Sequence, residues 1–147
     1  MKITLIISAD GHHKLVRWRL VIQGGIDGYS RLVVFLHCSD NNMATTVLER
    51  FQKAVEMYGL PSRVRTDQGL ENIKVAKFML VQRGCDRGSV LVGASVHNQR
   101  IERLWRDLYT AVVQLFKRLF YHLENTGLLS VGLLLSLWVA VGARSSP

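Results

Sequence analysis

The stretch KLVRWRLVIQGGIDGYSRLVVFLHCS, Lys14–Ser39, carries the pattern of two β-strands joined by a turn. The even positions in its first half are apolar: Val16, Trp18, Leu20 and Ile22. That alternation predicts a half-buried strand, Val16–Gln23, with a basic outer face. Arg31–His37 predicts a second strand. The segment GGIDGYS between them favours a turn because it contains three glycines, Gly24, Gly25 and Gly28.

A shorter apolar run precedes this pair of strands. Ile3–Ala9 is rich in residues that favour strands, and it ends directly before Asp10. A basic residue followed by apolar ones is typical of a signal peptide, but the run Ile3–Ile7 is too short for one and an acid soon follows. We therefore expect a buried first strand, which forms a three-stranded antiparallel meander with the next two.

Helices and strands alternate after this meander. SDNNMATTVLERFQKAVEMYGLP predicts a helix that ends at Gly59 and Pro61, and the candidate N-caps before it are Ser39, Asp40 and Asn41. The pattern then predicts a strand in SRVRTDQG, a helix at Val75–Gln82, a strand at Ser89–Val92 and a long helix at Asn98–Asn125. This order predicts an α/β domain with a mixed sheet flanked by helices, the ribonuclease H-like arrangement.

The composition indicates one basic domain. The 147 residues include 19 Lys+Arg against 11 Asp+Glu, a formal net charge of +8, and 48% of them are hydrophobic. Such a charge suits a polyanionic partner, either nucleic acid or an anionic membrane surface. Cys38 and Cys85 form no C-x-x-C pair, so we expect two buried, reduced thiols and no zinc site.

Three acids fall at positions where a site could form. Asp10 follows the first predicted strand, Asp67 ends the fourth, and Glu102 lies early on the long helix. Open α/β sheets bind ligands beyond strand ends. Carboxylates brought together repel one another unless a cation neutralises them, and Mg²⁺ or Mn²⁺ prefers such oxygen ligands. Taken alone, Glu102 fits a solvated charge on a helix surface better than a ligand.

Four segments resemble the catalytic core of the retroviral integrase and transposase superfamily. They are SADGHHKLVRW, GGIDGYSRLVVF, YGLPSRVRTDQGLEN and VHNQRIERLWRD, and the resemblance covers residues 9–129. It is strongest to transposon-derived integrase-core proteins of animal genomes. The resemblance implies a ribonuclease H-like fold and an origin in a mobile element. Ala9 departs from the HID sequence that such proteins commonly carry at the first acid.

The resemblance also implies a reaction and a metal site. Asp10, Asp67 and Glu102 match the catalytic acids of the family, which hold two Mg²⁺ or Mn²⁺ ions and carry out DNA phosphodiester cleavage and strand transfer. Between Asp67 and Glu102 lie 34 residues (102 − 67 − 1), close to the spacing in the family. Asp27 in IDGYSR is a rival for the first acid, but the corresponding motif of the family is structural.

The expected partner is DNA, and the resemblance implies a homo-oligomer if the protein is active and a nuclear location. The candidate DNA-binding residues are Lys14, Arg17, Arg19, Asn98, Gln99, Arg100 and Arg103. We expect His12 and His13 to be solvated beside Asp10, and Trp18 and Trp105 to be core residues. The alternative function is a domesticated, catalytically inactive module that binds nucleic acid or protein.

The end of the sequence departs from the family. Residues 1–129 form the core-like domain, with both of its ends open to question, and residues 130–147 form an apolar tail. Leu128–Ala143 is uncharged over sixteen residues, fewer than the ~20 that a spanning helix needs, so we expect no membrane insertion. The tail could be a core or interface helix, a tail anchor, or the product of an altered reading frame. We expect it to pack loosely or to project from the domain.

Overall fold

The structure, a computed structural model, describes residues 6–93, 99–130 and 132. Its centre is a five-stranded sheet in the order β3-β2-β1-β4-β5. The strands are β1 (Ile6–His12), β2 (Val21–Asp27), β3 (Val33–Ser39), β4 (Arg63–Thr66) and β5 (Val90–Val92). Neighbours among β1, β2 and β3 are antiparallel, whereas β4 runs parallel to β1 and β5 parallel to β4. The predicted mixed sheet, a meander extended by parallel strands, is confirmed.

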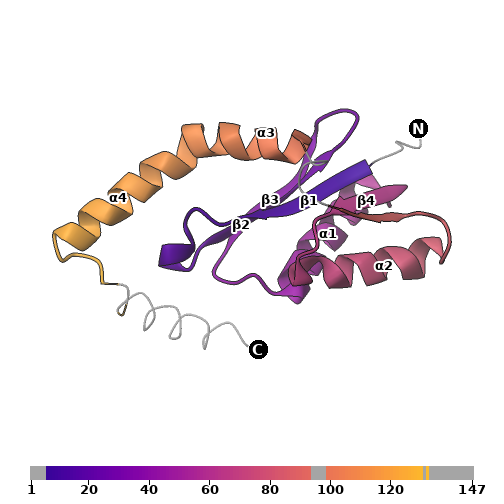
Figure 1. Cartoon of the computed structure of the whole chain (residues 1–147), viewed down its shortest axis with the longest axis horizontal. Coiled ribbons are helices and arrows are strands. Elements are labelled where there is room, and N and C mark those ends of the chain that lie inside the picture. The colour runs from indigo at the N-terminus through magenta and orange to yellow at the C-terminus, as the bar shows by residue number, and fades with distance from the viewer. Residues whose placement is uncertain (1–5, 94–98, 131, 133–147) are drawn as a thin grey trace.

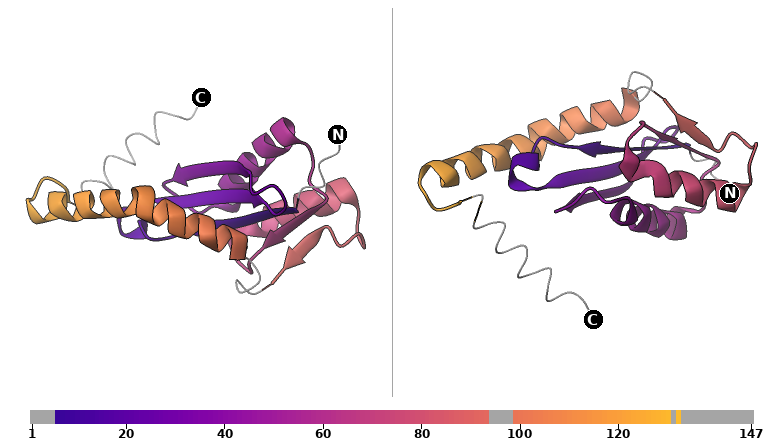
Figure 2. Two further views of the ribbon diagram at one scale, coloured as in Figure 1. Left: turned by 90° about the horizontal axis from the view of Figure 1, so that it is seen from above. Right: turned by 60° about the horizontal axis from the view of Figure 1, so that its bottom comes forward.

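Helices cover both faces of this sheet (Figure 1). On one face lie α1 (Ala44–Tyr58) and α2 (Ile73–Arg83), and α3 (Gln99–Leu108) crosses the other. A π-helical turn, Tyr109–Val113, joins α3 to α4 (Gln114–Asn125). The joined helix extends past the end of the sheet (Figure 2). Over its described length it confirms the predicted long helix, whose first residue, Asn98, lies outside the described residues.

The face under α1 and α2 carries a cluster of buried apolar side chains, which we call the first core cluster. Its buried members are Ile7, Val34, Val47, Phe51, Ala54, Val64, Val75 and Met79. Side chains of a strand alternate between faces, so Ile7 and Ala9 of β1 point to this side while Asp10 points to the other. Burial of the apolar stripes of α1 and α2 is therefore what fixes the orientation of β1 and its acid.

The face under α3 holds the second core cluster. Its buried members are Leu15, Trp18, Ile22, Ile26, Ile101, Trp105 and Val113. Trp18 and Trp105 are 2% and 5% exposed, which confirms the prediction that both are core residues. Because Trp105 comes from α3 and Trp18 from the segment between β1 and β2, this cluster fixes the long helix against the sheet.

The predicted strand Val16–Gln23 is wrong at its beginning. Val16–Trp18 forms a 3₁₀ turn, η1, and β2 starts only at Val21. The amide of Trp18 donates to the carbonyl of Leu15 at 3.0 Å. This turn places Leu15 and Trp18, three residues apart, on one side, where both are buried in the second core cluster. Burial of the two side chains therefore overrides the alternating pattern.

The predicted turn at the three glycines is also wrong in part. Gly24 and Gly25 lie inside β2, and only Gly28 belongs to the turn before β3. A Cβ atom on Gly24 would lie 2.8 Å from the Trp105 ring, and one on Gly25 would lie 2.3 Å from the Phe35 ring. The two glycines therefore allow aromatic side chains to approach the sheet closely, on opposite faces.

Two further predictions are corrected. The first helix begins at Ala44, and none of the predicted N-caps occupies the cap position, which is Met43; instead Asn41 Oδ1 accepts a bond from the Met43 amide at 3.0 Å. Cys38 and Cys85 are free, as expected, but exposed and not buried. Cys38 is exposed because it lies on β3, the edge strand of the sheet.

None of the helices in the described part of the chain is both long and apolar enough to cross a membrane. The predicted tail, 130–147, lies outside the described residues except for positions 130 and 132, and its expected loose packing stays a prediction. Gly127, with a positive φ of 71°, directly follows Thr126, the C-cap of the long helix.

Candidate active site

Two of the predicted catalytic acids lie on adjacent parallel strands at the same level. The last residue pair between β1 and β4 is Ala9 with Thr66, so the next position on each strand is an acid, Asp10 and Asp67. Asp10 remains paired with Gly24 of β2, because β1 continues to His12 on that side. The parallel register therefore brings Asp10 and Asp67, which are separated by 56 residues in sequence (67 − 10 − 1), to the same level of the sheet.

The third acid, Glu102, reaches the same region from above the sheet. The indole Nε1 of Trp105 donates to Asp10 Oδ2 at 3.1 Å and so fixes α3 over β1. Glu102 lies one turn before Trp105 and is exposed. With Asp10 it lines a groove of about 760 Å³ that continues along α3 and the π-helical turn to Lys117.

Electrostatic interactions connect the three acids. Burial raises the pKa of Asp10 above its ordinary value, and the negative charges of Asp67 and Glu102 raise it further. Hydrogen bonds from the Gly11 amide, at 2.7 Å, and from Trp105 oppose this rise. Asp10 therefore ionises less readily than an ordinary carboxyl group and has two other acids nearby. A bound cation would favour its ionised form.

Asp67 is held by its own local turn. Its Oδ1 accepts bonds from the Gly69 amide at 3.0 Å and from Asn72 Nδ2 at 2.9 Å. Asn72 is buried at the end of the 3₁₀ turn η2, Leu70–Asn72, directly before α2. The sequence TDQGLEN thus encodes both the acid and the amide that positions it, although the sequence pattern gave no role to Asn72.

His12 differs from its prediction. It belongs to β1 and is buried, with its ring centroid 5.4 Å from that of Trp105, whereas a solvated loop residue was expected. Burial lowers the pKa of His12, and the charges of Lys14 and His13 lower it further. His12 also lines the groove. The signal was its position two residues after Asp10, because such residues of a strand share one face.

The residues fit a hard divalent cation in chemistry, since all three candidate ligands are carboxylates and their charges act on one another. Across residues 6–93 and 99–130, however, no set of three His, Cys, Asp or Glu side chains is arranged closely enough to hold a metal ion. Asp10 and Asp67 are each engaged by hydrogen-bond donors of the protein itself. The metal site therefore stays a prediction.

The predicted DNA-binding residues lie in different parts of the structure. Lys14 lines the groove with Asp10 and Glu102. Gln99, Arg100 and Arg103 instead line a second pocket, on the other flank of α3. Arg19 follows η1 with a positive φ of 60°. Asn98 lies outside the described residues. In the groove, sequence analysis missed three other residues that carry a charge or an aromatic ring: Arg106, Tyr109 and Lys117.

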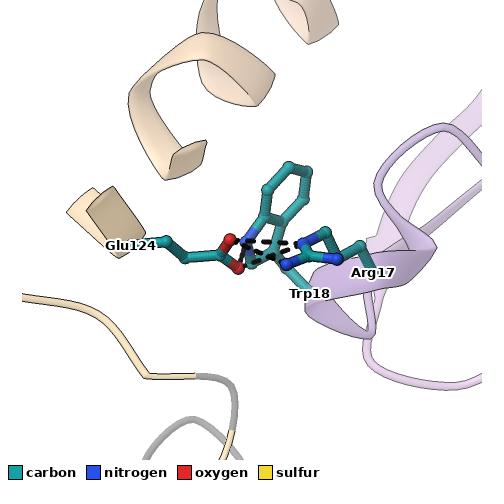
Figure 3. Close-up of polar contacts among 3 residues, drawn as sticks. All are labelled: Arg17, Trp18 and Glu124. Atoms are coloured by element: carbon teal, nitrogen blue, oxygen red, sulfur yellow. Dashed lines mark hydrogen bonds and ion pairs between the residues drawn. The ribbon is translucent and has the colours of Figure 1, made fainter. Parts of the chain in front are cut away.

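Arg17 forms part of a cluster with Trp18 and Glu124, which we call the α4 anchor (Figure 3). Glu124 accepts bonds from Trp18 Nε1 at 2.8 Å and from the Arg17 guanidinium at 3.1 to 3.3 Å. The bonds from Arg17 lower the pKa of Glu124, and the bond from Trp18 adds to this. Arg17 therefore has a partner at the end of α4 that its sequence neighbourhood does not reveal.

Comparisons with known proteins agree with this architecture. The HTLV-2 integrase catalytic core domain in complex with magnesium, in its trimeric form, superposes with a TM-score of 0.55 at 16% identity, covering 92% of this chain and 83% of that one. Its dimeric form gives 0.51 at 17% identity, over 92% and 84% of the two chains. The integrase of a simian T-cell lymphotropic virus intasome, in complex with PP2A regulatory subunit B56 gamma, gives 0.55 at 16% identity.

The intasome alignment covers 92% of this chain and 47% of that one, so this chain spans about half the length of that integrase. At these identities the likeness concerns the fold, which is thus an integrase-like α/β fold. Among curated proteins, none matches the sequence. The profile of the integrase core domain family, in contrast, matches residues 5–139. This chain therefore belongs to the integrase core domain family.

Proposed function

We propose that the protein is a metal-dependent polynucleotidyl transferase that cleaves DNA phosphodiester bonds and transfers strands. The observation that carries the proposal is the placement of Asp10 and Asp67 directly after the last β1–β4 pair, together with the rise that the charges of Asp67 and Glu102 cause in the pKa of Asp10. Family membership supports it, and so does the basic composition, since +8 suits a DNA partner.

Each residue of the candidate site has a distinct task in this proposal. Asp10, Asp67 and Glu102 would hold Mg²⁺ or Mn²⁺, with Trp105 and Asn72 orienting the two aspartates. When bound, such ions activate a water or hydroxyl and stabilise the leaving oxygen. The cations along the same groove bind the phosphates of the scissile strand: Lys14, Arg106 and Lys117.

The test is a Mn²⁺-dependent nicking and strand-transfer assay on duplex DNA. Glu102→Gln removes one carboxylate with almost no change in size, so we expect at least a hundredfold loss of product, in line with ~3 kcal/mol of transition-state stabilisation. The matched control is Glu56→Gln on α1, an exposed glutamate on the other face, which should retain wild-type activity. Equal activity of the two variants would remove Glu102 from the catalytic site.

A second candidate is a catalytically inactive module that binds nucleic acid or protein. The hydrogen bonds that already engage Asp10 and Asp67 favour it, because donors of the protein then occupy oxygens that a metal needs. Undetectable nicking by the wild type, with DNA binding retained in the absence of metal, would identify this function.

We also propose that the protein forms a homo-oligomer and is located in the nucleus. The HTLV-2 integrase catalytic core has been solved in a trimeric and a dimeric form. In this chain, an exposed apolar stripe on α4 and the preceding turn supports association: Val112, Leu115, Phe116 and Leu119. Light scattering on the purified protein measures its mass, and imaging of a tagged full chain tests the location; a monomer or exclusion from nuclei would contradict these expectations.

A further inference from the structure

A pocket on the other flank of α3 has no part in the proposed reaction. It measures about 480 Å³ and lies between α3 and the turn that connects β2 to β3. Ile26 and Leu104 contribute to its apolar wall, and three arginines reach it: Arg31, Arg100 and Arg103. Glu102 and Arg103 are neighbours in sequence, yet Glu102 lines the groove with Asp10 and Arg103 lines this pocket. The helix therefore separates the groove from a pocket with three arginines.

The guanidinium groups in this pocket are available to a ligand. Within residues 6–93 and 99–130, none of the three arginines forms an ion pair, although Asp107 also lines the pocket. All three are exposed at the surface. Three guanidiniums against one carboxylate leave a local excess of positive charge. A planar guanidinium donates two parallel hydrogen bonds to a phosphate, so an arginine-lined pocket fits a phosphate group.

The backbone that carries Arg31 is fixed by the IDGYSR motif. Asp27 is completely buried and its Oδ2 accepts bonds from the Ser30 amide at 2.7 Å and from the Ser30 hydroxyl at 2.6 Å. Asp27 also pairs through its backbone with Leu32 and Arg31, at 2.8 and 3.0 Å. Arg31 is thereby held at a positive φ of 64°, uncommon for a residue with a side chain. Asp27 therefore builds the arginine pocket rather than the acid site.

An aromatic side chain lies on the same turn. Tyr29 is 90% exposed, although large aromatic rings gain most from burial. Exposed aromatic rings beside basic residues are what proteins use to stack the bases of single-stranded nucleic acid. A duplex offers no free base face at such a site. Tyr29 precedes Arg31 by two residues on this turn, so the surface formed by the turn and the pocket offers an exposed ring and arginines, which match a base and its phosphate.

We propose that this surface binds an unpaired nucleotide of a DNA strand, with the phosphate in the arginine pocket and the base on Tyr29. The inference rests on the proposed function for its choice of DNA as the polyanion, but it needs neither metal nor catalysis. The bound segment lies on the opposite flank of α3 from Glu102, so it is DNA beyond the bond that is cut.

The experiment measures fluorescence anisotropy of a labelled single-stranded oligonucleotide with EDTA present. The triple variant Arg31→Gln, Arg100→Gln, Arg103→Gln should bind more weakly and lower the log–log salt slope by up to about 2, from ~0.7 per phosphate contact. The control carries the same loss of charge at exposed positions elsewhere, Lys53→Gln, Lys74→Gln and Arg87→Gln. Circular dichroism establishes that both variants are folded. Equal slopes in the two triple variants would overturn the proposal.

Tyr29 gives a second readout that charge does not affect. Tyr29→Ala should weaken binding of the single strand about fivefold or more and leave duplex binding unchanged, whereas Tyr29→Phe, which keeps the ring, should bind as the wild type does. If alanine and phenylalanine behave alike, no base stacks on Tyr29 and the single-strand assignment is wrong. Both measurements are made with EDTA present and need no catalysis, so this inference and the proposed reaction fail independently.

Discussion

The two faces of the sheet use apolar side chains for different purposes. Under α1 and α2, the first core cluster contains only apolar residues and its function is stability. Under α3 and α4, both buried tryptophans also donate hydrogen bonds to carboxylates, Trp105 to Asp10 and Trp18 to Glu124. The second face therefore combines packing with the placement of charge. A change on the first face should alter stability alone, and a change on the second should alter both.

The largest effect is expected on the first face. Phe51 on α1 is completely buried, so Phe51→Ala should lower the free energy of unfolding by about 3–5 kcal/mol through lost burial and a residual cavity. Urea denaturation followed by circular dichroism measures this change. Met57→Ala on the same helix, where the side chain is exposed, should stay within about 0.5 kcal/mol of wild type. A loss of DNA binding by folded Phe51→Ala protein would show that the faces are not separate.

An intermediate, pH-dependent effect is expected on the second face. The pKa of Asp10 is raised mainly by burial, so the folded protein without metal binds a proton more readily than the unfolded chain. The stability that Asp10 contributes to the folded protein is therefore present at low pH. It is lost as the pH rises through the pKa of Asp10 in the folded state. Asp10→Asn removes this charge but leaves one oxygen for the two donors, the Gly11 amide and Trp105 Nε1, so the stability of the variant minus that of the wild type should be larger at pH 7 than at pH 4; the variant should also lose Mn²⁺ binding.

Denaturation of the metal-free wild type and Asp10→Asn at pH 7 and pH 4 measures this difference. It should shrink at pH 4, where the wild-type carboxyl takes up its proton. A difference that grows toward low pH would mean that the Asp10 carboxylate is stabilised in the folded state, and that the comparison of the two faces is wrong at this residue.

The prediction of the three acids used local signals, and that of their surroundings could not. Asp67 and Glu102 were predicted from motif and spacing, and Asp10 from the end of an apolar run, although β1 continues past it to His12. The hydrogen bond between Trp18 and Glu124 joins residues 106 positions apart, and no local pattern reveals it. The rotation of α3 about its axis decides which pocket Glu102 and Arg103 each face. Packing of Ile101 and Trp105 determines that rotation. Successive helical residues differ by about 100°, so neighbours can face different pockets.

The smallest effect is expected at the α4 anchor. Bonds from Arg17 lower the pKa of Glu124, so its contribution to stability is present at neutral pH and is lost as pH falls through that lowered pKa. Glu124→Gln should leave the global unfolding transition almost unchanged and increase hydrogen exchange in α4 at pH 7. Acidification should bring the exchange of the wild type toward that of the variant. Faster exchange throughout the sheet would mean that the anchor stabilises the whole domain.

The π-helical turn Tyr109–Val113 divides the long helix into two halves of different phase. A π turn amounts to one extra residue in an α-helix, and one residue corresponds to a rotation of about 100° and a shift of about 1.5 Å. Deleting a single residue there would make the helix regular and turn Glu124 away from Trp18, while Trp105 would stay at Asp10. A single helical wheel consequently misplaces one half of this helix, and an alignment with a relative that lacks the turn must shift by one residue after Val113.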